Sequence, residues 1–425
     1  MTPSVVQLEH LLFATLLQLA VMISAARLLN TLFRRMGQPG VIGEIVAGLA
    51  LGPSLLGALF PGVSHALFGG GASQVISIIS QIGLILLMFQ IGTDFEFGHL
   101  RERRYAGAML AIAATSISVP FGLGLLVGWR SAPLLAASID PVTYSLFMGV
   151  GMAITAVPIL GRILRQYDLT RTPIGVVAIS AAALNDVVGW VLLAVISAYA
   201  SANLSGTHIA LQLAGIVAFA LLLWLVVRPL VKRLLAASPP GEHGVAPNVM
   251  AVVIGLTFVA GMCTFKLGIF AIFGGFAMGI LFHHDAAFVR TWRHQVGAFV
   301  LVFFLPVFFT YTGLRTNVLG LGAADLPWLA VILAASILGK VLPVYLAARA
   351  ARFPHYEACM LGTLMNTRAL MELIVLNIGF DLGFLPQKVF TMMVVMAVVT
   401  TIMTGPLLKL LMPRAGYALP AHIEA

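Results

Sequence analysis

Charged residues are scarce in this sequence. Only 9% of its 425 residues are Asp, Glu, Lys or Arg, whereas soluble domains carry about 25%. Hydrophobic residues make up 60% of the chain. A soluble fold of this length cannot bury so much apolar surface. We therefore expect lipid, rather than water, to surround most of the chain.

Motifs of soluble enzymes and of cysteine-based sites are also absent. The two cysteines, Cys263 and Cys359, lie in apolar stretches without CxxC spacing, which excludes a disulfide framework and favours packing roles. The sequence has no P-loop, no GxGxxG turn and no nucleophile elbow with partners. Its net charge of +9 is scattered over loops rather than gathered on one face. We expect no enzyme, no cofactor and no nucleic-acid partner.

Long apolar segments fill the chain instead. Only helices or closed barrels satisfy every backbone polar group in lipid. Barrel strands alternate apolar and polar residues, whereas these segments run apolar for roughly 18–25 residues, the length of a spanning helix. We predict an all-α polytopic membrane protein with about 13 transmembrane helices. The predicted spans cover residues 8–30, 41–57, 74–96, 105–129, 143–165, 172–200, 207–228, 247–265, 268–283, 295–313, 325–350, 355–380 and 387–412.

The loop charges predict an orientation. Most of the 24 lysines and arginines fall in loops on one side of the predicted membrane, which the positive-inside rule makes cytoplasmic. This places the C-terminus in the cytoplasm and the N-terminus outside, in a cytoplasmic (inner) membrane. We expect one membrane domain over residues 1–415 and a short tail, 416–425, without a regulatory domain. Residues 1–10 contain no Lys or Arg, so a cleavable signal peptide is not indicated.

Two halves of the chain share a weak pattern. The glycine-rich second span resembles residues 268–279, and the end of the third span resembles residues 312–317. If the span count holds, the second and ninth spans cross in opposite directions, which is typical of an inverted repeat. The repeats would cover about 41–200 and 268–412. Glycines at this spacing also occur wherever helices pack closely, so that alternative stays open.

Five charged residues lie deep inside predicted spans, where each charge is costly. They are Glu44, Asp186, Lys340, Arg368 and Glu372. Asp186 stands among small and apolar residues, so we predict that it binds a proton and a cation by turns. The alternative is that it and Asn185 only join neighbouring helices. Lys340 would tune the pKa of Asp186 or form an ion pair.

The fifth predicted span carries a sign of interruption, and under the repeat the twelfth span corresponds to it, so two interrupted helices would cross. Pro158 breaks the helical ladder, so Thr155 and the freed carbonyls could ligate a dehydrated cation, unless the proline only kinks the helix. Arg368 and Glu372 are four residues apart and therefore share one helix face, which predicts an internal ion pair. Together with Asn366 and Pro158, they would hold two crossing interrupted helices together.

The remaining candidates are weaker. Glu44 is a possible gate, although packing is the alternative. A histidine group next to two arginines predicts a solvated loop rather than a metal site, because the arginines repel cations. These histidines are His283, His284 and His294. We expect no metal beyond a transported monovalent cation.

Three segments resemble a known family. Residues 38–57 (QPGVIGEIVAGLALGPSLLG), 306–316 (PVFFTYTGLRT) and 361–377 (LGTLMNTRALMELIVLN) look like signatures of the cation:proton antiporter-2 family. The resemblance implies a 13-helix inverted repeat with a mobile core and a dimerisation domain, usually as a homodimer. It also implies that Thr155 lies among the ligands of an unwound helix. Electrogenic members carry Asp-Asp where this chain has Asn185-Asp186, which suggests electroneutral exchange, whereas Lys340 matches the lysine of electrogenic members.

These features predict a secondary antiporter that exchanges Na⁺ or K⁺ for H⁺ by alternating access. Asp186 would carry the ions, with Asn185 and Thr155 as further ligands. A proton- or sodium-coupled transporter of an organic solute on the same fold is the main alternative. A membrane sensor or scaffold that transports nothing is a second one. Sequence patterns do not distinguish Na⁺ from K⁺, because that selectivity depends on sub-ångström ligand geometry.

Overall fold

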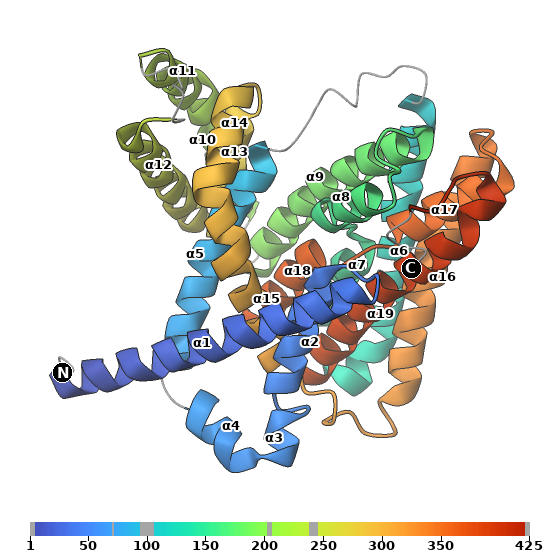
Figure 1. Cartoon of the computed structure of the whole chain (residues 1–425), viewed down its shortest axis with the longest axis horizontal. Helices are drawn as coiled ribbons and strands as arrows, with labels where there is room; N and C mark the ends of the chain where they lie inside the picture. Colours follow the sequence, from blue (N-terminus) through green and yellow to red (C-terminus); the bar gives the residue numbers. More distant parts are fainter. Residues whose placement is uncertain (1–4, 70–71, 94–105, 202–205, 238–244, 421–425) are drawn as a thin grey trace. The chain divides into compact units, whose positions relative to one another are not determined.

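The computed structural model describes residues 5–69, 72–93, 106–201, 206–237 and 245–420, and the described residues form helices and loops without a strand (Figure 1). Residues 421–425 of the expected tail lie outside this set. The first half contains α1 (Val5–Arg35), α2 (Gly40–Leu51), α3 (Leu56–Leu59), α4 (Pro61–Phe68), α5 (Ala72–Thr93), α6 (Ala106–Leu135), α7 (Pro141–Ala153), α8 (Val157–Gln166) and α9 (Pro173–Ser201).

The second half is helical as well. It contains α10 (Gly206–Leu222), α11 (Arg228–Ala237), α12 (Pro247–Lys266), α13 (Ala271–Phe282), α14 (Ala286–Trp292), α15 (Leu305–Leu314), α16 (Leu326–Ala350), α17 (His355–Met365), α18 (Leu370–Asp381) and α19 (Gln387–Leu411). Short π-helical turns η2 (Leu223–Val227), η3 (Arg293–Gly297) and η4 (Val300–Phe304) and a 3₁₀ turn η5 (Pro413–Ala415) lie between or after them.

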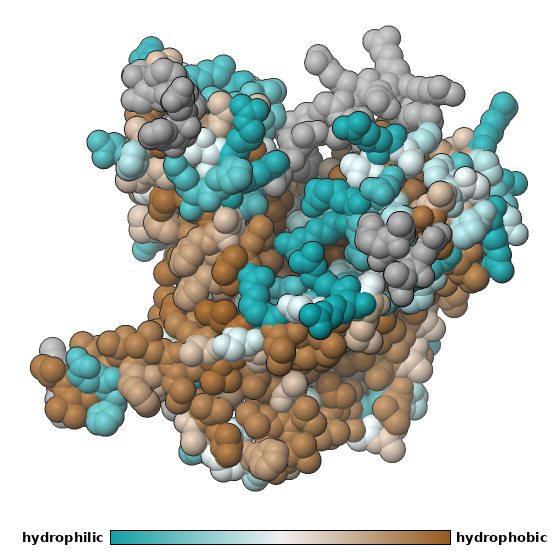
Figure 2. Space-filling model, in the orientation of Figure 1, coloured by the Kyte–Doolittle hydropathy of each residue, from teal (hydrophilic) through white to brown (hydrophobic). Residues whose placement is uncertain are grey.

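The all-α membrane fold is confirmed, whereas the count of 13 spans is not. Among the described residues, 11 helices or broken helices are long and apolar enough to cross a membrane, or 12 if the bent pair Ala286–Gly297 and Val300–Leu314 forms one span. The remaining predicted segment, 268–283, contains α13, which has 12 residues. This helix is shorter than a full span requires. Hydrophobic side chains cover much of the visible helix surface (Figure 2), as expected of helices that face lipid.

The chain divides into two compact units. Unit 1 comprises Met1–Ile23, Leu67–Glu96 and Ala194–Tyr311, and unit 2 comprises Ser24–Ala66, Phe97–Leu193 and Thr312–Ala425. In unit 1, α13 packs closely on α5 through glycine. A Cβ added at Gly279 would lie 2.1 Å from the carbonyl oxygen of Phe89, and one at Gly275 would lie 2.3 Å from that of Ile85. Gly275 and Gly279 therefore allow close packing of these two helices.

Unit 2 contains two helices that are broken in mid-span. One is α7–α8 and the other is α17–α18. In their most apolar stretches, 78% of α7–α8 and 94% of α17–α18 is buried, against 28% of the unbroken α16. The two broken spans therefore lie inside this unit, where other helices shield their interrupted backbone from lipid.

The two breaks have different local causes. The first covers Ile154–Ala156, where the Pro158 ring would clash with the carbonyl of residue 154 in a continuous helix. The second lies between Met365 and Leu370 and contains no proline. There Ala369 adopts φ 94° and ψ −96°, a conformation that residues with a Cβ rarely adopt.

Candidate ion-binding site

The two broken spans meet at their non-helical residues. The Ala156 amide donates to the carbonyl of Thr367 at 3.2 Å, and the Thr155 hydroxyl donates to the carbonyl of Met365 at 2.9 Å. Met365 is the last residue of α17, so Thr155 satisfies a carbonyl that the broken helix leaves without an intrahelical partner. These bonds join segments that are more than 200 residues apart in sequence.

Asp186 lies on α9 next to the start of α8. It is 3% exposed, and its carboxylate lies near the backbone N–H of Val157, the first residue of α8. A helix N-terminus carries partial positive charge and favours an anion. The Oδ1 atom accepts no hydrogen bond from any described residue. One buried carboxylate oxygen is therefore free to take a proton or a cation.

Asn185 connects α9 to α6 and to the break between α7 and α8. Its Nδ2 donates to Ser116 Oγ on α6 at 2.8 Å and to Thr155 Oγ1 at 3.3 Å. Asn185, Thr155 and Ser116 are all fully buried. The structure thus brings together the three residues predicted to bind the ion, and adds Ser116, which the sequence analysis missed. A hydroxyl in the middle of an apolar span was the available signal. Such hydroxyls, however, commonly bond to their own helix, as Ser116 also does to Ala113.

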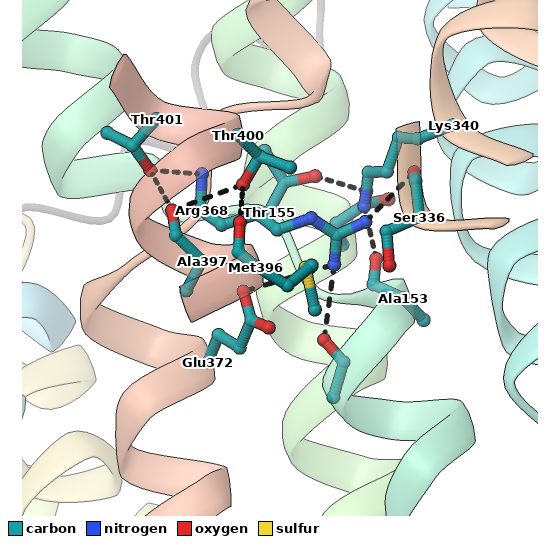
Figure 3. Close-up of polar contacts among 12 residues, drawn as sticks. Ala153, Thr155, Ser336, Lys340, Arg368, Glu372, Met396, Ala397, Thr400 and Thr401 are labelled. Carbon is teal, nitrogen blue, oxygen red and sulfur yellow. Dashed lines mark hydrogen bonds and ion pairs between the residues drawn. The ribbon is translucent and has the colours of Figure 1, made fainter. Parts of the chain in front are cut away.

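Lys340 and Arg368 lie at the C-terminal end of α7 (Figure 3). Lys340 Nζ donates to the carbonyl of Ala153, the last residue of α7. Arg368 Nη1 donates to the carbonyl of Gly151 at 3.2 Å, and Nη2 to that of Ser336 at 3.3 Å. Two fully buried cations therefore complement the partial negative charge of this helix end.

The position of Lys340 differs from one of its predicted arrangements. The charges of Lys340 and Asp186 are close enough to act on each other, but the two side chains form no ion pair within the described part of the chain. The ammonium is engaged by Ala153 instead. Its contact with a helix end could not be anticipated without knowing where α7 stops.

Glu372 occupies the first turn of α18. It forms the predicted internal pair with Arg368, at 3.9 Å between Nη1 and Oε2, and neither of its carboxylate oxygens accepts a hydrogen bond from a described residue. Asp186 and Glu372 thus lie at the N-terminal ends of two half-helices, α8 and α18. With Lys340 and Arg368 at the end of α7, each charge has a helix end of opposite partial charge next to it.

Two predicted residues lie apart from this cluster. Asn366 turns toward α19, where its Nδ2 is 3.7 Å from Met403 Sδ. Glu44, on α2, accepts a hydrogen bond from Asn30 at 2.7 Å.

For His283 and His284, the ring centroids are 3.6 Å apart. Within the described ranges, no group of three or more His, Cys, Asp or Glu residues could hold a metal ion.

Comparisons with known proteins agree with this architecture. A solved sodium proton antiporter, MjNhaP1 from Methanocaldococcus jannaschii, superimposes with a TM-score of 0.65 at 15% identity. The match covers 94% of this chain and 96% of that one. At this identity the likeness shows the fold alone.

Related sequences extend over nearly the whole chain. The Na(+)/H(+) antiporter NhaS4 of Synechocystis is 35% identical over 97% of this chain and 99% of its own length. Cation/H(+) antiporter 17 of Arabidopsis thaliana is 36% identical over 94% of this chain, and K(+)/H(+) antiporter 1 of Saccharomyces cerevisiae is 26% identical over 94%. The chain spans about half the length of the latter two, 48% and 46%. The family model described as "Sodium/hydrogen exchanger, transmembrane" matches residues 20–413, and the chain therefore belongs to the sodium/hydrogen exchanger family.

Proposed function

We propose that the protein is a secondary active antiporter that exchanges a monovalent cation, Na⁺ or K⁺, for H⁺, with Asp186 as the shared binding group. The observation that carries this proposal is a buried carboxylate that lies beside the N-terminal end of a half-helix and has one free oxygen. A proton and a dehydrated cation compete for that oxygen. Competition alone couples the two fluxes, because each ion leaves only when the other can replace it.

The surroundings of Asp186 supply further ligands of the kind that a hard cation takes. Alkali cations prefer oxygen donors, and the hydroxyl of Thr155, the amide oxygen of Asn185 and the carbonyls at the breaks are oxygens close by.

Lys340 and the pair Arg368–Glu372 have supporting roles in this proposal. Because Lys340 is held by Ala153, it tunes the proton affinity of Asp186 through its charge and does not replace the cation as a direct partner. Arg368 and Glu372 keep the crossing helices together. With one carboxylate per site, we propose electroneutral exchange of one cation for one proton.

The wider assignments are proposals too. They place the protein in the cytoplasmic membrane as a homodimer, with the N-terminus outside, the C-terminus in the cytoplasm and no enzymatic activity. The two repeats would cover about 41–200 and 268–412. Unit 2 contains the crossing and would be the mobile core, and unit 1 would provide the dimerisation surface.

Reconstituted vesicles test the proposed function. A pH gradient is imposed with the membrane potential clamped, and Li⁺, Na⁺, K⁺ or Rb⁺ is added in turn. Wild type should dissipate the gradient with at least one cation, whereas Asp186→Asn should not respond. Glu357→Gln is a matched control, because the Glu357 carboxylate accepts a hydrogen bond from the Tyr417 hydroxyl, away from the contact between the two broken spans. This variant should respond as wild type does. If wild type ignores every cation, the proposal fails and an organic solute becomes the leading candidate.

A further inference from the structure

A second buried carboxylate lies where α1 meets α2, and ion exchange at Asp186 makes no use of it. Glu44 is 2% exposed. Its Oε1 accepts a hydrogen bond from Asn30 Nδ2 at 2.7 Å, and its Oε2 accepts none from any described residue. Burying an ionisable group with one oxygen unsatisfied is costly, so its presence needs a reason.

The backbone around Glu44 is arranged to bring Asn30 to it. Gly40 and Gly43 let α2 approach α1 more closely than any side chain would allow. A Cβ added at Gly43 would lie 2.3 Å from the carbonyl oxygen of Leu29, and one at Gly40 would lie 2.5 Å from the side-chain amide of Asn30. A structural hydrogen bond to Asn30 would be served by a glutamine at lower cost, because an amide carries no charge to desolvate.

The charged groups around Glu44 come from three helices. Arg27 on α1 and Arg162 on α8 act on its charge, and Arg34 and Arg165 act in turn on Arg162. On α19, which also packs against α2, the nearest charge to the α1–α2 turn is Lys409, beside Gly37. Glu44 is an acidic residue among these basic ones. Protonating its carboxylate therefore changes the electrostatic forces on the three helices that carry them.

Arg162 links this place to the ion site. It belongs to α8, a single helix of 10 residues whose first N–H, that of Val157, lies near the Asp186 carboxylate. Because a short helix moves as a rigid element, a force on Arg162 also acts on the N-terminal end of α8, which lies beside the proposed ion site.

We propose that Glu44 is a second proton-binding site, which sets the rate of exchange according to pH on its own side of the membrane. That side is the cytoplasm in the proposed orientation, so the inference rests on the proposed function. A proton taken from water binds Oε2, while Asn30 keeps donating to Oε1 in both states. Charged Glu44 attracts Arg162 and restrains α8. Protonated Glu44 loses this attraction and releases α8 to carry Asp186 through its cycle.

The variant Glu44→Gln tests this in transport. Glutamine keeps the shape and still accepts from Asn30, but it is permanently neutral. We expect the cation preference to stay unchanged. We also expect exchange to persist at alkaline pH on that side, about fivefold or more above wild type, with a flatter pH profile. The control Glu357→Gln should keep the wild-type profile. An unchanged profile in Glu44→Gln would overturn the proposal, and Glu44→Asp serves as the check if the glutamine variant does not fold.

A titration that needs no transport separates this inference from the function on which it rests. Infrared difference spectra of purified Asp186→Asn protein across a pH series should retain a carboxyl protonation signal that disappears in Asp186→Asn/Glu44→Gln. If the double variant lacks the signal that Asp186→Asn retains, Glu44 is a proton-binding site. That conclusion holds even if wild type exchanges no cation. If the two spectra coincide, Glu44 does not titrate and the proposal is wrong, whatever the exchange assay shows.

Discussion

At the scale of single residues, charge was the most informative signal in the sequence. The five deep charges could be found by position alone, because lipid leaves few of them. Four of these, Asp186, Lys340, Arg368 and Glu372, lie at or beside the ends of half-helices α7, α8 and α18. Their individual partners could not be predicted, since most are backbone groups that become available only where a helix breaks.

Ser116 offers a test at this scale. Removing its hydroxyl leaves Asn185 Nδ2 without its 2.8 Å acceptor, so the amide loses its fixed orientation toward Thr155. We expect Ser116→Ala to raise KM for the cation by roughly threefold to tenfold, the value of about one hydrogen bond, with a smaller change in kcat. Exchange rates at varied cation concentration measure both constants.

The matched control for that variant is two residues further along α6. Ser118 is exposed and donates only to the carbonyl of Ala114 in its own helix. Ser118→Ala should keep the wild-type KM. Equal effects of the two substitutions would mean that Ser116 acts through the helix in general and has no role at the ion site.

At the scale of secondary structure elements, the two breaks were not equally predictable. Pro158 predicts the first break, because a proline in mid-helix removes a backbone N–H donor and clashes with the preceding turn. The second, at Asn366–Ala369, has no such residue and followed only from the weak repeat. Its backbone is bent at Ala369, whose φ of 94° depends on the tertiary contacts that hold the crossing together and on no local preference.

The conformation of Ala369 leads to a stability prediction. Glycine adopts this backbone geometry without strain, so Ala369→Gly should stabilise the protein by about 1 kcal/mol. Ala369→Val should destabilise it, because a β-branched side chain is still less compatible with positive φ. Thermal unfolding in detergent measures both, and a lower midpoint for the glycine variant would show that the crossing does not strain this residue.

A second element-scale prediction concerns the loop before α16. Asp325 accepts from Lys388 Nζ, at the start of α19, at 2.8 Å and from the Gly322 amide at 2.9 Å. The Lys388 bond holds the pKa of Asp325 below its usual range. The resulting stability is therefore fully present above the ordinary carboxyl pKa of about 3.9 and is lost as pH falls through the lowered value.

A double-mutant cycle measures that contribution. Asp325→Asn, Lys388→Met and the double variant should give a coupling of a few tenths to about 1 kcal/mol at neutral pH, because Lys388 is 54% exposed. The coupling should vanish in acid. A coupling that is the same at neutral and acidic pH would contradict the assignment.

At the scale of the whole molecule, composition was sufficient for the fold class but not for the number of spans. All 13 predicted segments contain helix, yet α13 has only 12 residues and α14–α15 is bent by 43°. Hydropathy is averaged over a window of residues. A short helix with apolar flanks and a bent pair of helices therefore both give the pattern of one continuous apolar segment. The division of the chain into units was likewise hidden, because it depends on contacts between distant segments.

The proposed orientation can be tested on the intact protein. In a background with Cys263 and Cys359 replaced by alanine, a single Ser138→Cys or Arg414→Cys substitution introduces an exposed thiol at one end or the other. A membrane-impermeant maleimide added to whole cells should label position 138 and should reach position 414 only after lysis. The reverse pattern would place the C-terminus outside.

The central claim is that a proton and a cation compete for the carboxylate of Asp186, and proton release measures this most directly. The transported cation is added to purified protein in weak buffer near neutral pH, and the protons that appear are counted. Wild type should release up to about one proton for each cation bound, and Asp186→Asn should release none. Release that persists in Asp186→Asn, or cation binding by wild type without any release over the pH range of exchange, would contradict the account.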